Sequence, residues 1–458
     1  MDSISRKMAR FARSLSYEAI PETARGEAKR FLLDSVGCAL AALDLPDMQA
    51  AYRYVREVGG KRQATIIGHG TRTDLPNAAL LNSLLIRALD YNDIYWKQDP
   101  SHPSDVIPAA LAAGEHRLAS GRDLIVGIVI AYELEMRLCL AATPGVREVG
   151  WHHASLTQFV SPLVAGRMLG LSEDELVAAV GISGSSHFTL GGVVAGHLTN
   201  MKNTADPMAT EAGVRAALLA RTGYTGPTEV FEGKEGVFSV LKQVKWDPQA
   251  MVDGLGEKFL ITECGYKAFP TEALTHQPIT ATLDLVRENR IEPHDVEKIL
   301  VKTTTRGADI LSDPSKYQPT TKETADHSLP YGIAVAAAKG HVLPSDFEES
   351  ALKDPLVWEL LPRIKVVADP EIDLLFPKVK RAIVTITTKK GATFTRQEDF
   401  AKGQPERPLS QEELVAKFRS NAEAIMTARR MDRVVERTLA LERVEKAGDY
   451  MRLLVRDR

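Results

Sequence analysis

Cysteine is scarce in this sequence, with three residues among 458. Cys38, Cys139 and Cys264 form no C-x-x-C pair, so a disulfide framework is not expected. An iron–sulfur cluster is usually held by cysteines that include at least one close pair. We therefore do not expect a hydratase that depends on such a cluster.

Motifs for metal ions and nucleotides are also missing. The chain has no H-x-x-x-H or H-E-x-x-H spacing, no phosphate loop and no G-x-G-x-x-G. His152 and His153 are adjacent, and two neighbouring rings cannot easily share one metal from a regular element. The sequence therefore predicts no metal site and no nucleotide cofactor.

No hydrophobic run is long enough to cross a membrane. The best run, residues 124–132, lies between two acids and is far shorter than the roughly 20 residues a spanning helix needs, so it predicts a buried helix. The N-terminal segment carries arginines and serines, but Asp2, Glu18 and Glu22 argue against a transit peptide. We expect a cytoplasmic protein.

Charge of one sign is not in excess either. The chain has 57 basic and 60 acidic residues and a net charge of −3, which gives no reason to expect nucleic acid or an anionic membrane as a partner. Hydrophobic residues make up 44% and charged residues 26%, as in ordinary globular proteins. The length is enough for two or three domains.

Periodicity changes along the chain. The first half has helical spacing, with a capping box at Ser172–Glu175 and an alanine-rich helix at 208–222 that carries Gly213 on one face. Alternating strands are predicted at 298–305, 382–388 and 392–396, the last two joined by a turn.

Helices are predicted at 278–288 and 331–339, between the strands. A capping box at Ser410–Glu413 opens the helical C-terminus. We predict a mostly α chain: a large all-helical domain built from both chain ends, residues 1–262 and 408–458, and an inserted smaller α+β lid domain, residues 263–407.

The densest polar segment holds Asp90 and His102. His102 lies between small turn residues with prolines on either side, so it cannot belong to a helix or central strand. A fixed imidazole with carboxylates nearby suits proton transfer, although Asp and Ser beside Pro are also common in simple turns. Ser104 and Asp105 are predicted to cap the helix that follows.

Other candidates are scattered along the chain. His152 follows Gly-Trp, Lys202 precedes the alanine-rich helix, and Lys267 lies at the domain change with Glu272 and His276 after it. Tyr331 begins a helix of small residues. Each has a plainer explanation: a helix-start histidine, a solvated lysine or a core tyrosine. Together they suit a substrate with several carboxylates and a proton to be moved on carbon.

The chain resembles the MmgE/PrpD family, which includes 2-methylcitrate dehydratase, cis-aconitate decarboxylase and iminodisuccinate epimerase. The resemblance runs over nearly the whole length. Its motifs are Leu32–Cys38, Leu89–Asp93 continuing to His102–Asp105, Gly150–His152, Met201–Lys202 with Gly223–Pro227, Lys267–Glu272 and Glu323–Tyr331.

The resemblance implies a homodimer without metal or organic cofactor, a polycarboxylate substrate and a place in propionate catabolism. By the same resemblance the site is lined by Asp90, His102, His152, Lys202, Lys267 and Tyr331, with Glu272 beside them. Ile94 stands where relatives often carry threonine, His153 where many have proline, and Glu272 where the decarboxylases carry histidine.

Our hypothesis is a metal-independent hydro-lyase that dehydrates a 2-methylcitrate or citrate type of hydroxy-tricarboxylate. Lys202 and Lys267 would bind carboxylates, His102 oriented by Asp90 would move the proton, and Tyr331 or His152 would protonate the departing hydroxyl. Alternatives are decarboxylation of cis-aconitate, epimerisation, and a catalytically silent carboxylate-binding protein. A purely structural scaffold predicts that Lys202, Lys267 and His102 point to different surfaces.

Overall fold

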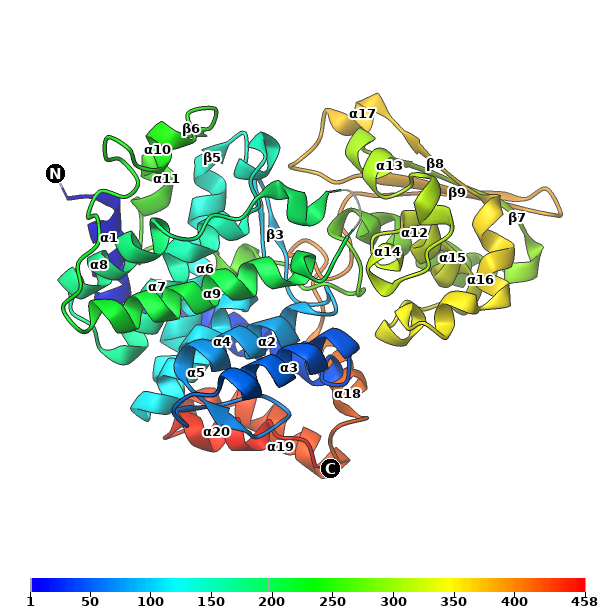
Figure 1. The fold of residues 1–458 in the computed structure, drawn as a ribbon. Helices are drawn as coiled ribbons and strands as arrows, with labels where there is room; N and C mark the ends of the chain where they lie inside the picture. Colours follow the sequence, from blue (N-terminus) through cyan, green and yellow to red (C-terminus); the bar gives the residue numbers. More distant parts are fainter. Residues whose placement is uncertain (1, 196–197, 458) are drawn as a thin grey trace. The chain divides into compact units, whose positions relative to one another are not determined.

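The computed structural model describes residues 2–195 and 198–457. The chain divides into two compact units, which are described separately (Figure 1). The larger, helical unit comprises Met1–Ala88, Asn92–Cys264 and Ser410–Arg458. The smaller, mixed unit comprises Gly265–Leu409 together with the short segment Leu89–Tyr91.

The centre of the helical unit is made of helices that are buried on nearly every side. All residues of α4 (Leu75–Arg87) are buried, and in α7 (Ala154–Leu169) only Arg167 is not. Helices without a polar face belong in the interior of a large core. The apolar run at 124–132 lies in α6 (Gly121–Ala141), which is buried as predicted.

The helix pair α7 and α9 (Met201–Ala220) packs unusually closely, and the two run side by side in Figure 1. A Cβ atom added to Gly213 of α9 would lie 2.0 Å from Ser161 Oγ of α7, so only glycine fits there. The alanine-rich helix that carries Gly213 therefore makes a tight contact at this glycine. It brings the N-terminal halves of both helices together, where the polar site residues lie.

Shorter elements complete the helical unit. Both predicted capping boxes are confirmed, at Ser172 for α8 (Glu173–Gly184) and at Ser410 for α18 (Gln411–Ala422). The other helices are α1 (Ile4–Ser14), α2 (Glu22–Ala41), α3 (Pro46–Val58), α5 (Ile107–Arg117), α10 (Val237–Val240), α11 (Pro248–Val252), α19 (Ala428–Leu439) and α20 (Ala447–Leu453). Three short antiparallel pairs join β1 (Ala64–Thr65) to β2 (Arg72–Thr73), β3 (Tyr95–Trp96) to β4 (Pro100–Ser101), and β5 (Ala142–Thr143) to β6 (Lys245–Trp246).

A four-stranded sheet of order β10-β9-β7-β8 forms the base of the smaller unit. Its strands are β7 (Val296–Thr303), β8 (Ile364–Ala368), β9 (Ala382–Thr388) and β10 (Thr393–Glu398). The pair β7–β8 is parallel and the others are antiparallel. The predicted strand, turn and strand are confirmed as the β9–β10 hairpin, whose turn uses Gly391 at φ +83°.

Helices pack against this sheet. α12 (His276–Asn289) contacts β9 and β10, and α15 (Leu329–Lys339) contacts β8 and α12. Both helices were predicted. Short helices complete the unit: α13 (Thr305–Ile310), α14 (Lys322–Ala325), α16 (Pro355–Leu360) and α17 (Pro370–Asp373). The predicted fold class, mostly helical with a smaller α+β part, is confirmed.

Within the described part of the chain, we find no helix with the length and apolar character that a membrane crossing requires.

Candidate active site

His102 is held in the loop between β4 and the short 3-10 turn Pro103–Val106. It is 6% exposed, and its Nδ1 lies 2.6 Å from the backbone oxygen of Asp93. A carbonyl oxygen only accepts, so Nδ1 carries the ring proton and Nε2 is left as the basic nitrogen. The predicted orienting partner was the Asp90 carboxylate. The Asp93 backbone oxygen, which the sequence did not predict as a partner, accepts a hydrogen bond from Nδ1 of this ring.

Asp93 and Ser104 fix this loop. The Asp93 carboxylate accepts hydrogen bonds from Ser104 Oγ at 2.6 Å and from the Ser104 backbone N–H at 3.0 Å. Burial raises the pKa of Asp93 to about 6. Our prediction that Ser104 and Asp105 cap the next helix is wrong, because α5 begins at Ile107 without a side-chain cap. Asp105 instead accepts from Asn92 and lies 3.5 Å from the Arg87 guanidinium.

Three imidazoles gather in the helical unit. The ring centroids of His152 and His153 are 3.9 Å apart, and those of His102 and His153 are 5.6 Å apart. His152 Nδ1 accepts from the Ala154 N–H at 3.2 Å, so Nε2 carries its proton. Burial, and then the charge of His153, lowers the pKa of His152 well below its usual value. His102 and His152 are thus brought together through His153, which the prediction left outside the site.

Asp206 of α9 completes this group. Its Oδ2 lies 3.3 Å from His153 Nε2, and its Oδ1 lies 3.1 Å from Thr157 Oγ1. Burial alone would raise the pKa of Asp206, but the charge of His153 and a hydrogen bond from it hold this pKa below the usual range. We call His102, His152, His153 and Asp206 the histidine cluster. We argued that two adjacent rings cannot easily share a metal from a regular element, but both rings precede α7, and one donor atom from each lies within 4.8 Å of the other and of one from Asp206.

Glu135 of α6 lies beside the histidine cluster. Its Oε1 accepts from Thr157 Oγ1 at 2.7 Å and from Ser101 Oγ at 2.9 Å. Burial raises the pKa of Glu135 to about 8, so this carboxyl group is protonated at neutral pH. Glu135 and Asp206 were both missed in the sequence. Two features of the sequence could have indicated them: Glu135 is an acid inside an apolar helix, and Asp206 is an acid one helical turn after Lys202.

Lys202 lies in the first turn of α9, four residues before Asp206, so both side chains project from the same side of the helix. It is 2% exposed, and the alternative of a solvated lysine is wrong. A buried ammonium group at a helix N-terminus adds to the positive potential of the free backbone N–H groups there. This position suits an anionic ligand.

In the smaller unit, Lys267 forms a buried ion pair with Asp90. Its Nζ donates to Asp90 Oδ1 at 2.6 Å, and to the backbone oxygens of Asp90 and Thr271 at 3.1 Å each. An ammonium group has three protons, so these three acceptors use them all. Asp90 has a φ of +49°, a conformation that non-glycine residues seldom adopt. Lys267 therefore stabilises a strained turn, and binding a substrate carboxylate would require it to exchange one of these partners.

Glu272 and Tyr331 also have internal partners. Glu272 Oε2 accepts from the Leu274 N–H at 2.6 Å and caps the turn that precedes α12. Tyr331 Oη donates to the Asp346 backbone oxygen at 2.8 Å, its ring packs edge-on against Phe347, and burial raises its pKa. A tyrosyl group placed in this way matches the core tyrosine that we gave as the alternative to a proton donor.

A lysine that the sequence analysis did not select lies near Glu272. Lys380 is 8% exposed, and its Nζ donates to the Pro377 backbone oxygen at 3.1 Å. Burial lowers the pKa of Lys380 to about 8, while the charge of Glu272 opposes that shift. The Lys-Val-Lys-Arg run around it resembles an exposed basic segment, so nothing in the sequence distinguished it.

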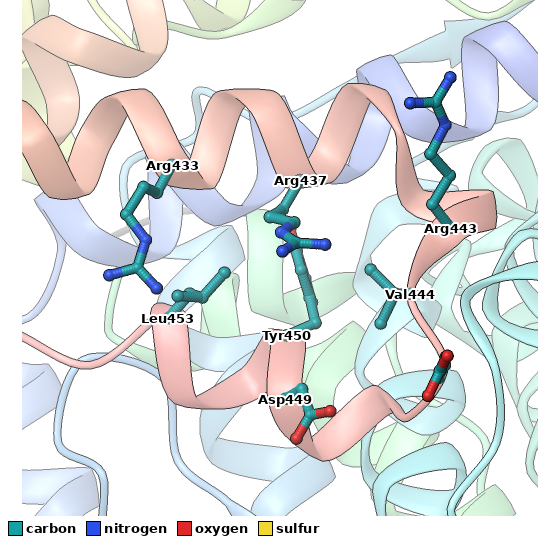
Figure 2. Close-up of a pocket in the computed structure, with 8 residues that line it drawn as sticks. Arg433, Arg437, Arg443, Val444, Asp449, Tyr450 and Leu453 are labelled. Carbon is teal, nitrogen blue, oxygen red and sulfur yellow. The ribbon is translucent and has the colours of Figure 1, made fainter.

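A surface pocket of about 300 Å³ lies between α19 and α20. Figure 2 shows Arg433 and Arg437 of α19 beside Leu453 and Tyr450 of α20. The arginines could attract an anion, but no histidine and none of the predicted site residues lines this pocket. The histidine cluster is therefore the better candidate for proton-transfer chemistry. Lys202, Lys267 and His102 are all buried within their own units.

The chain is similar over nearly its whole length to several known proteins. Cis-aconitate decarboxylase-like protein oryM of Aspergillus oryzae is 26% identical over 99% of this chain and 97% of its own length. The 2-methylcitrate dehydratase of Escherichia coli K12 is 26% identical over 96% and 95%, and human cis-aconitate decarboxylase is 25% identical over 99% and 95%. Residues 6–249 match the MmgE/PrpD N-terminal domain and residues 269–441 the C-terminal domain. This chain belongs to the MmgE/PrpD family.

Proposed function

We propose that this protein is a lyase that removes water from a hydroxy-tricarboxylate of the 2-methylcitrate or citrate type without a metal ion. The observation that carries the proposal is the histidine cluster, in which the His102 ring, held through Nδ1 by the Asp93 backbone oxygen, lies 5.6 Å from the His153 ring. Relatives named as dehydratases and decarboxylases support lyase activity of the same general kind.

In this mechanism His102 Nε2 takes the proton from the carbon next to a carboxylate. His152, whose Nε2–H is available for donation, hydrogen-bonds to the departing hydroxyl group. The C–H and C–O bonds break, a C=C bond forms, and the hydroxide leaves as water with the proton that His102 accepted. Tyr331, given earlier as an alternative donor, would first have to release the Asp346 oxygen.

Lys202 and Lys267 are proposed to bind substrate carboxylates through charge-assisted hydrogen bonds, each contributing about 1.5–3 kcal/mol. Neutralising the carboxylate beside the reacting carbon lowers the cost of the negative charge that develops there. Asp90 would act through Lys267, with which it pairs. Glu272 would help to position substrate from the turn that it caps.

The second candidate is a cis-aconitate decarboxylase, because the relatives include proteins with that name. Epimerisation and silent carboxylate binding use the same lysines. Incubation with citrate, 2-methylcitrate and cis-aconitate, followed by mass spectrometry, separates them. Loss of 18 Da is expected from one of the two hydroxy acids. Loss of carbon dioxide, or binding without any change of mass or optical rotation, would contradict the dehydratase.

A homodimer in the cytoplasm is part of the same proposal. Analytical ultracentrifugation of the full chain is expected to give twice the 50.2 kDa mass of one chain. A single species at the monomer mass, with full lyase activity, would contradict the dimer without affecting the proposed reaction.

A further inference from the structure

Three side chains with metal-binding groups meet where α7 begins beside α9. His152, His153 and Asp206 are 1%, 3% and 1% exposed. One donor atom from each lies within 4.8 Å of the other two, the one such group in residues 2–195 and 198–457. Two histidines and one carboxylate form a ligand set that transition-metal ions of the zinc type prefer.

The spacing of the best-placed pair matches a shared ion. His153 Nε2 and Asp206 Oδ2 are 3.3 Å apart. Two ligands of a tetrahedral Zn²⁺ at about 2.1 Å each lie about 3.4 Å from one another. A zinc-type ion can therefore enter between these two atoms with little change in their separation, and His152 is the third ligand.

The hydrogen-bonding state of these atoms also favours a ligand. Apart from their 3.3 Å contact with each other, both ring nitrogens of His153 and Oδ2 of Asp206 are buried without a hydrogen-bond partner among the described residues. Buried polar atoms are normally paired, so each such atom requires an explanation. Thr157 contacts the other Asp206 oxygen at 3.1 Å, as a supporting group behind a metal ligand does.

The surroundings set the kind of ion and limit its affinity. The charges of Arg147 and Arg87 act on His152, and they oppose a dication. Asp99 lies near enough for the charge of His153 to act on it, and partly offsets them. His152 must also give up its weak 3.2 Å bond from Ala154 or move its ring proton. These costs favour ions that bind imidazole strongly over Mg²⁺ and Ca²⁺, which prefer oxygen ligands.

We propose that His152, His153 and Asp206 form a binding site for a divalent zinc-type cation, and that the bound ion inhibits the enzyme by occupying His152. The inhibition rests on the proposed function, in which His152 hydrogen-bonds to the departing hydroxyl. The binding of the metal ion does not depend on the proposed function.

Cobalt binding tests the site without any substrate. Tag-free protein is treated with a chelator and dialysed, and Co²⁺ is added while the visible ligand-field absorption is recorded. The wild type is expected to bind one Co²⁺ per chain, and Zn²⁺ to displace it. His153→Asn and Asp206→Asn should each weaken binding by at least the roughly 10–100-fold seen when only a supporting group is lost. His116→Asn, in a half-buried histidine of α5, is the matched control and should bind normally.

Thermal unfolding without metal shows whether each variant is folded, and His153→Gln is a second variant if His153→Asn is not. No cobalt signal with the wild type, or equal binding by the wild type and folded His153 variants, would overturn the site. In activity assays Zn²⁺ should inhibit the wild type, and a chelator should restore it. If the wild type binds Co²⁺ at this site but Zn²⁺ does not lower its activity, the proposal that the bound ion inhibits the enzyme is overturned. If no tricarboxylate is turned over, the proposed function fails, while the cobalt titration still decides the site.

Discussion

In the smaller unit the Lys267 ammonium group donates to three oxygens, whereas in the helical unit several polar atoms of the buried site lack hydrogen bonds within the described structure. Glu135 Oε2 is one of them and Asp206 Oδ2 is another. Both sites are equally buried, with Lys267 at 1% and Asp206 at 1% exposure. They therefore differ in how their polar groups are satisfied and not in their exposure to water.

This difference separates a group that must exchange a partner before it binds a ligand from groups that can act on a ligand directly. A saturated ion pair fixes the strained turn at Asp90, and breaking it leaves a buried charge without compensation. The His153 imidazole and the carboxyl groups of Glu135 and Asp206 keep lone pairs without hydrogen bonds in the described structure, and burial or charge perturbs the pKa values of these two carboxyl groups. Substitutions in the two sites should therefore affect different quantities.

The largest expected effect is on catalysis in the helical unit. His102→Ala removes the basic Nε2, and turnover of the hydroxy-tricarboxylate should fall by about 10²–10⁴-fold. The midpoint of thermal unfolding should change little, since the ring lies in a loop, where its Nδ1 donates to a backbone oxygen at 2.6 Å. Steady-state kinetics and calorimetry measure the two quantities.

His116→Ala provides a control for loss of a histidine elsewhere in the same unit, and it should retain wild-type turnover. Full activity in a folded His102→Ala protein would remove His102 from the mechanism. Loss of folding in that variant would instead assign the loop a structural role like that of Lys267.

The next largest effect is on stability in the smaller unit. Lys267→Met removes the ammonium partner of the buried Asp90 carboxylate, and the free energy of unfolding should fall by about 3–5 kcal/mol. The double variant with Asp90→Asn should recover part of that loss, because no charge is then left without a partner. Urea denaturation measures both changes. A loss under about 1 kcal/mol in the single variant would show that the pair is not the conformational clamp described above.

The sequence predicted the secondary structure of both units better than it predicted the polar contacts. The alternation of apolar and polar residues predicted β9 and β10, and the helical spacing of apolar residues predicted α12 and α15. These patterns are visible in the sequence because they arise from local geometry and from burial of one face. Capping boxes at Ser172 and Ser410 depend on residues three positions apart, and both were found.

The polar partners were harder to predict because they depend on how distant helices pack. His153 and Asp206 meet since Gly213 lets α9 approach α7, and no local pattern encodes that distance. Likewise, the positive φ of Asp90 and its pairing with Lys267, 177 positions away, follow from tertiary structure. Ser104 has the residue type of a helix cap, yet a buried carboxylate of Asp93 competes for its hydroxyl.

A smaller effect concerns the pH dependence of stability. Because the pKa of Glu135 is raised by burial to about 8, the folded state keeps a proton that the unfolded state loses near its ordinary pKa. Glu135 thus stabilises the fold fully below that ordinary value, and the contribution is lost as pH rises toward 8. Between pH 7 and 8 the unfolding free energy of the wild type should fall more steeply than that of Glu135→Gln, by at most about 1.4 kcal/mol per pH unit.

Chemical denaturation at pH 7.0, 7.5 and 8.0 measures this slope. Asp93 and Asp99, whose pKa values are raised to about 6 by burial, titrate mainly below that window. If the unfolding free energies of the wild type and Glu135→Gln changed equally with pH, Glu135 would already be ionised at pH 7. Its negative charge would then be stabilised by neighbouring groups in the helical unit.

The smallest effect separates the structural and catalytic accounts of Tyr331. Tyr331→Phe deletes the hydrogen bond to the Asp346 oxygen but keeps the ring packed against Phe347. The free energy of unfolding should fall by about 1 kcal/mol, as for a typical internal hydrogen bond, while turnover changes by less than about tenfold. Denaturation and steady-state kinetics on the same preparation measure both. A fall in turnover of about 10²-fold or more without loss of stability would show that Tyr331 takes part in proton transfer. A general acid needs the hydroxyl that this substitution removes, whereas a core tyrosine keeps the packing of its ring.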